Sequence, residues 1–142
     1  MIVIKIEELN KYINALLNKS EEAYLMSIEI INKPTINYRT EGFCFFICNA
    51  WELLLKAYLI NKAKDINVIN YKDGTNRTIG LDECVEKVFT STTDKTKNNI
   101  SFVRNIRNKA THLILPEYDF ILSPAFQRCL INFSKNNFQN II

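Results

Sequence analysis

The sequence predicts an all-α domain: a four-helix bundle with an extra short helix and a short hairpin or irregular insertion around residues 65–80. Apolar residues recur every three or four positions over most of the chain, which is the period of amphipathic helices. Only three glycines and three prolines occur in 142 residues. With 47% hydrophobic residues, a chain of this length can bury one core, so we expect a single domain over residues 1–142.

Two long helices are predicted in the first half of the chain, over residues 6–32 and 40–63. The first is apolar along one side, and Pro34 ends it because the residue before a proline avoids the helical conformation. The second is apolar almost all round, which predicts a central place in the bundle. Thr40 is its expected N-cap, since a threonine hydroxyl can accept a bond from a free backbone N–H.

The second helix also bears on cellular location. Its apolar run, Phe43–Ile60, is interrupted by Asn49, Glu52 and Lys56, which a membrane span tolerates poorly. Glu52 and Lys56 are four residues apart, so we expect them to form an ion pair. The first residues do not follow the pattern of a signal peptide. We therefore expect a cytoplasmic protein with no membrane contact.

Residues 65–80 change in character. β-branched residues flank the turn signal Asp73-Gly74, which favours a short hairpin or an irregular insertion. A brief helix is predicted next, over residues 81–90, with its apolar residues on one side.

Two further helices complete the bundle. One is predicted over residues 95–115 and ends before Pro116. The other is predicted to begin at Ser123 as N-cap, with Pro124 at the first helical position, and to run to about residue 137.

Several classes of function are excluded by residues that are scarce. The glycines are too far apart to build a phosphate-binding loop. The single histidine, His112, excludes a multi-histidine metal centre. Of four cysteines, Cys44 and Cys48 share a face among phenylalanines, and the chain has no C-x-x-C pair. We expect free thiols in a reducing compartment, with no metal and no cofactor.

The charge distribution points to an anionic partner. The net charge is only +3, but the segment from Lys95 to Pro116 holds basic residues and no acidic one. Its basic residues are Lys95, Lys97, Arg104, Arg107 and Lys109. A solvated helix face with no partner is the alternative interpretation.

On a helix, this segment separates into two faces. The expected apolar stripe consists of Phe102, Ile106, Ala110 and Leu113, with Val103 and Ile114 beside it. The opposite face carries Arg104, Arg107, Asn108, Thr111 and His112, and the segment supplies no carboxylate to neutralise it.

These side chains suit phosphodiester chemistry. Imidazole titrates near pH 6.5, so His112 can take or give a proton at cellular pH. A guanidinium such as that of Arg107 stays charged and grips phosphate with paired donors. RNA cleavage needs a general base, a general acid and a positively charged group that stabilises the transition state. No metal is required in that scheme. Since each chain has one histidine, a two-fold homodimer would supply the second.

The run Arg107-Asn108-x-x-x-His112 resembles the R-x(4–6)-H motif of the HEPN (higher eukaryotes and prokaryotes nucleotide-binding) superfamily. Two other stretches, within residues 38–57 and 77–85, resemble a HEPN subfamily known as a bacterial domain of unknown function. The likeness covers roughly residues 38–115. It implies a HEPN-like four-helix bundle with the motif late in the chain.

The resemblance further implies a metal-independent endoribonuclease that works as a homodimer with a composite site. Such proteins often act as toxins or in abortive infection, a form of phage defence. Carried over by position, Arg107 and His112 match the catalytic pair and Asn108 the polar position after the arginine. Some HEPN toxins have a tyrosine two residues after the histidine, which a partner antitoxin modifies. Ile114 stands there in this chain, so that mode of silencing is not expected, although an antitoxin partner is.

Arg104, Lys109 and Lys97 are predicted RNA contacts on charge alone. Two alternatives to an enzyme remain. One is a non-catalytic HEPN module that binds a nucleotide, RNA or a protein, and the other is a plain helical interaction domain. The non-catalytic module would use the same basic face without turnover. As single residues, His112 has the alternative interpretation of a helix C-terminal histidine favoured by the dipole, and Arg107 that of a salt-bridge residue at an interface.

Overall fold

The computed structural model describes residues 2–110 and 119–139, with side-chain burial for residues 5–110 and 122–136. Every regular element in these ranges is helical, so the all-α prediction is confirmed. The elements are α1 (Ile2–Ile31), α2 (Arg39–Ala63), the 3₁₀ helix η1 (Ile66–Ile69), α3 (Leu81–Val88), α4 (Lys95–Ala110) and α5 (Asp119–Gln139).

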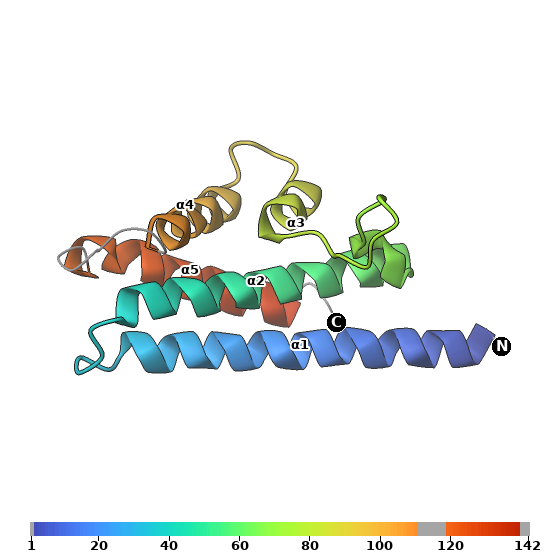
Figure 1. Ribbon diagram of the computed structural model, residues 1–142, viewed down its shortest axis with the longest axis horizontal. Coiled ribbons are helices and arrows are strands. Elements are labelled where there is room, and N and C mark those ends of the chain that lie inside the picture. The colour runs from blue at the N-terminus through green and yellow to red at the C-terminus, as the bar shows by residue number, and fades with distance from the viewer. Residues whose placement is uncertain (1, 111–118, 140–142) are drawn as a thin grey trace.

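Helix α2 is the centre of the bundle, as its all-round apolarity predicts (Figure 1). It runs antiparallel to α1 along most of its length, while α3 and α4 lie on the side of α2 away from α1. Helix α5 packs against both α2 and α4. The core joins α2 to α5 through aromatic side chains: Trp51 lies edge-on to Phe133, and Phe43 packs against Phe126.

Helix α2 is also the one helix in the described ranges that is long and apolar enough to cross a membrane. Its most apolar window is 67% buried inside the bundle. The core helix of a helical bundle can have the same length and composition, so this finding does not decide whether α2 meets a membrane.

The N-terminus of α2 differs from the prediction. Tyr38, and not Thr40, is the N-cap, and its backbone oxygen accepts the first helical bond from the Gly42 N–H at 2.9 Å. Thr40 lies in the first turn with 1% of its surface exposed. Its hydroxyl has no hydrogen-bond partner among the described residues. Thr40 lies on the same face of α2 as Phe43 and Cys44, which are three and four residues further on and fully buried.

The insertion after α2 is a small hairpin-like loop, as expected. An isolated antiparallel bridge joins Asn70 to Thr78, and Gly74 takes a positive φ of 78° at the turn between them. Lys56 fastens the loop to α2, because its Nζ donates to Thr78 Oγ1 at 3.0 Å.

The predicted ion pair between Glu52 and Lys56 is confirmed, with Nζ and Oε2 3.0 Å apart. The Lys56 side chain is only 7% exposed, whereas that of Glu52 is 28% exposed.

The start of α5 was predicted wrongly. The helix begins at Asp119, and Pro124 lies inside it. A proline early in a helix removes one backbone donor without stopping the turns before it. Leu122 packs against the core and helps hold those turns in place.

Candidate nucleic-acid interface between α2 and α4

Helix α4 is rotated from the predicted orientation. Its buried apolar residues are Ile100, Val103, Ile106 and Ala110, whereas Phe102 is 47% exposed. With Ile106 at zero, Ile100 lies near 120° and Arg107 near 100° around the helix. Arg107 is therefore at the edge of the buried stripe and faces α2, while the prediction placed it on the face away from the core.

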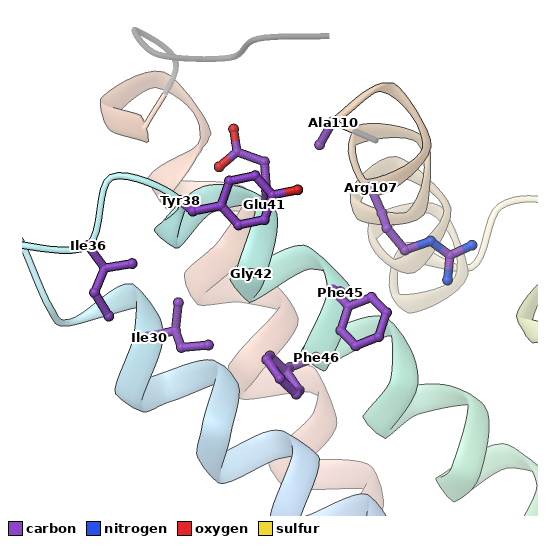
Figure 2. A pocket seen from close by; sticks show the side chains of 9 residues that line it. All are labelled: Ile30, Ile36, Tyr38, Glu41, Gly42, Phe45, Phe46, Arg107 and Ala110. Carbon is purple, nitrogen blue, oxygen red and sulfur yellow. The ribbon is translucent and has the colours of Figure 1, made fainter. Parts of the chain in front are cut away.

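Arg107 lines two neighbouring hollows, and Phe45 of α2 lines both of them as well. The first, here called the aromatic hollow, has a volume of about 280 Å³. Figure 2 shows its lining: three rings, a carboxylate and the guanidinium side chain. These belong to Tyr38, Phe45, Phe46, Glu41 and Arg107.

The second, here called the polar hollow, has a volume of about 320 Å³. Asn49 and Glu52 line it together with Phe45 and Arg107. An amide, a carboxylate and a guanidinium thus meet at one opening, where they can exchange hydrogen bonds with a polar ligand.

Four of the α2 residues that line the two hollows form one strip of that helix, and Gly42 and Phe46 lie beside it. Glu41, Phe45, Asn49 and Glu52 follow one another at spacings of four, four and three residues, which keeps them on one face. The apolarity of this helix almost all round predicts a central, buried place, but Phe45 is 58% exposed. Asn49 and Glu52, the polar interruptions of an apolar helix, were the available signal for this strip.

Glu41 occupies the first turn of α2, where the helix dipole favours a carboxylate. Its Oε2 atom is buried and has no hydrogen-bond donor within the described parts of the chain. Burial of an acceptor without a hydrogen-bond donor costs free energy, so this oxygen is an unsatisfied acceptor.

The predicted pair Arg107 and Asn108 is in contact. Arg107 donates from Nε and Nη2 to Asn108 Oδ1, at 3.3 and 3.2 Å. Asn108 is exposed and Arg107 is half-buried, so the asparagine holds the guanidinium from the solvent side. His112, the remaining member of the predicted site, lies outside the described residues.

The three predicted RNA contacts differ in their surroundings. Lys109 is exposed on α4. Arg104 pairs with the carboxylate of Asp82, and Lys97, only 9% exposed at its side chain, pairs with Glu86 at 3.1 Å. The segment itself contains no carboxylate, but two carboxylates of α3, those of Asp82 and Glu86, pair with its basic side chains.

The two buried thiols of α2, those of Cys44 and Cys48, are not reactive groups. Burial raises the pKa of Cys48 to about 12, although the positive charges of Arg107 and Arg104 act in the opposite direction. Burial also raises the pKa of Cys44, with a further upward contribution from Glu41 and a lowering by Arg107. Both thiols stay protonated at neutral pH, so neither is a nucleophile. Within residues 2–110 and 119–139, no three His, Cys, Asp or Glu residues gather as a metal site.

The fold and the site together define a small all-helical bundle with an arginine-lined pair of hollows between its second and fourth helices. Residues 15–141 match the sequence profile of a family described as Domain of unknown function (DUF3644), and the chain belongs to that family. Comparisons with curated proteins and with solved structures found no match.

Proposed function

We propose that this chain is a metal-independent endoribonuclease of the HEPN type that acts as a homodimer, in the role of a toxin or an abortive-infection effector against phage. The observation that carries the proposal is the position of Arg107. Its guanidinium is half-buried, is held by Asn108, and borders two hollows large enough for parts of a nucleotide chain.

The chemistry follows from what a phosphodiester needs. The 2′-oxygen of a ribose attacks the adjacent phosphorus, the bond from phosphorus to the 5′-oxygen breaks, and a 2′,3′-cyclic phosphate and a 5′-hydroxyl result. His112, which enters on the sequence alone, takes the 2′-hydroxyl proton or supplies the proton to the leaving oxygen. Arg107 grips the phosphate and stabilises the charge that develops on its oxygens.

The neighbouring side chains support a nucleotide without providing a second acid or base. Asn49 offers neutral amide groups to a sugar or phosphate. The carboxylate of Glu52 is engaged by Lys56 at 3.0 Å, which limits its repulsion of an incoming phosphate. Since one chain has a single histidine, the proposal assigns the second proton transfer to the other protomer.

The test is RNA cleavage by the purified protein in the presence of EDTA. We expect products with 2′,3′-cyclic phosphate and 5′-hydroxyl ends, and no cleavage by His112→Ala or Arg107→Ala, with fold and dimer intact. Cleavage by either variant at the wild-type rate would remove the enzyme proposal. RNA that is bound but never cut would favour the non-catalytic HEPN module instead.

The cellular role has a separate test. Expression of the wild-type chain should arrest growth of a bacterial host, and His112→Ala should relieve the arrest at equal protein level. Normal growth with the wild-type chain expressed would argue against a toxin.

A further inference from the structure

Arg104 lies one turn before Arg107 on α4, on the side of that helix that meets α3. The two arginines are three positions apart, so they are neighbours on the helix surface, about 60° apart around its axis. Burial is the main cause of the raised pKa of the Cys48 thiol, and the charges of Arg107 and Arg104 both lower that pKa. Both guanidinium groups therefore lie near one point of α2.

The guanidinium of Arg104 is engaged by two neighbours in the structure. Its Nη2 pairs with the carboxylate of Asp82, in the first turn of α3, and its Nη1 donates to Asn105 Oδ1 at 2.9 Å. The side chain of Arg104 is 30% exposed and that of Asp82 is 58% exposed. Solvent and ions reach such a pair, so it contributes little to stability and can be exchanged.

Helix α3 does not depend on this pair for its position. Helices α3 and α4 each pack against α2 and make little contact with each other (Figure 1). Three residues of α3 are buried in the common core: Leu81, Cys84 and Val85. Asp82 can therefore release Arg104 while α3 keeps its place in the bundle.

From these observations we infer that Arg104 is a second phosphate site of the interface, and that Asp82 is an intramolecular competitor that occupies it until an RNA strand binds. A carboxylate and a phosphate offer the same kind of acceptor oxygens to a guanidinium, so one can replace the other. The inference rests on the proposed function, which places the scissile phosphate at Arg107. It adds a requirement on the substrate, which must carry a further phosphate next to the one that is cut.

Lys97 differs from Arg104, although it also pairs with a carboxylate of α3. Its partner is Glu86, and the Lys97 Nζ and Glu86 Oε2 atoms are 3.1 Å apart. The Lys97 side chain is only 9% exposed, so removal of the Glu86 charge does not open the ammonium group to a phosphate. Glu86→Gln is therefore the matched control for Asp82→Asn, because each variant removes one negative charge from α3.

The test is binding of a non-cleavable 2′-O-methyl RNA to the purified full chain, measured by fluorescence anisotropy. We expect Asp82→Asn to strengthen binding about two- to fivefold, because the phosphate no longer displaces a carboxylate from an exposed pair. Glu86→Gln should leave the affinity nearly unchanged, because salt screens a charge that does not touch the strand. Thermal unfolding of both variants checks that the fold is kept.

Arg104 must carry the effect of Asp82. Arg104→Gln keeps part of the side-chain stem and should weaken binding, with a salt dependence reduced by about 0.7 in slope for one lost phosphate contact. In that background, Asp82→Asn should give no further gain.

A second measurement uses the wild-type protein and changes the RNA. One neutral methylphosphonate linkage is placed next to the scissile position, on the 5′ or the 3′ side. We expect one of the two positions to weaken binding to the wild type several-fold and to have no effect on Arg104→Gln, because that variant has already lost the contact.

The outcomes separate the second phosphate site from the nuclease. Equal gains in Asp82→Asn and Glu86→Gln, a gain that persists without Arg104, or no effect of either neutral linkage would overturn the second site, while RNA cleavage by the same protein would keep the nuclease. An Asp82 effect that requires Arg104, in a protein that never cleaves RNA, would keep the second site and remove the nuclease.

Discussion

The guanidinium of Arg107 donates two hydrogen bonds to the side-chain oxygen of Asn108, at 3.3 and 3.2 Å, and so is held at the rim of both hollows. The bonds come from its Nε and Nη2 atoms. A guanidinium fixed in this way loses less conformational freedom when it meets a phosphate.

Asn108 is therefore expected to position Arg107. Asn108→Ala should lower kcat for RNA cleavage about two- to tenfold with little change in KM, which corresponds to the loss of one ordinary hydrogen bond. The matched control is Asn105→Ala, since Asn105 accepts a bond from Arg104 in the same way, at 2.9 Å. Equal effects of the two variants would argue against a special role for Asn108.

Two of the lysines of α4, Lys109 and Lys97, should behave differently in RNA binding. Lys109→Ala is expected to weaken binding of a non-cleavable 2′-O-methyl RNA and to reduce the salt dependence, by about 0.7 in slope for one lost phosphate contact. Lys97→Ala should leave the slope unchanged, because its ammonium group is paired with Glu86. Binding measured at several salt concentrations checks this. A loss of slope in Lys97→Ala alone would contradict the assignment.

Lys56 should matter for stability. Lys56→Ala leaves Glu52 and Thr78 without their shared donor and is expected to lower the free energy of unfolding by about 1–3 kcal/mol. Lys56→Met keeps the aliphatic packing and should lose less. Urea denaturation measures both, with Lys33→Ala as control for an exposed pair.

The control pair, Lys33 with Glu29, is separated by 3.7 Å with both side chains more than half exposed, so its loss should stay within about 0.5 kcal/mol. A similar loss in the two alanine variants would show that burial of the Lys56 pair has no consequence.

The four cysteines should be unreactive in the folded protein. All are buried, and burial raises the pKa of each thiol, to about 12 for Cys48, Cys84 and Cys129. We expect no alkylation by iodoacetamide at pH 8 until urea unfolds the chain. Rapid labelling of the native protein would contradict the buried placement.

The same thiols set a pH dependence of stability. Their pKa is higher in the folded state than the value of about 8.5 in an unfolded chain. Their contribution to the free energy of unfolding is thus complete below about pH 8.5. It decreases as the pH rises above that value, because only the unfolded state then releases the thiol protons. Urea titrations between pH 7 and 10 would detect this decrease, and a variant with fewer cysteines should show less of it.

Much of the fold was predictable from local patterns. The periodicity located all the main helices, and the all-round apolarity of residues 40–63 placed that helix at the centre. The errors occurred where a neighbour decides the outcome. In α4, apolar residues cover a wide arc, and only the packing of α2 selects Ile100 over Phe102 for the core.

The candidate site was predictable in part. The sequence motif singled out Arg107 and Asn108 together, and their side chains are hydrogen-bonded in the structure. The pairing of Arg104 with Asp82 was not foreseeable, because the two residues are 22 positions apart and meet only when α3 and α4 both pack against α2. Glu41 and Phe45 were missed for the same reason, since the hollow that they line forms only when α4 lies beside α2.

The most direct measurement is single-turnover cleavage of a labelled RNA by the wild type, Arg107→Ala and Arg107→Lys. We expect both variants to lose at least about 100-fold in rate, because an alanine removes the charge at the phosphate and a lysine cannot offer paired donors. Thermal unfolding should be unchanged, since Arg107 lies at the rim of the hollows and not in the core. Wild-type cleavage by Arg107→Ala, in a folded dimer, would contradict the account.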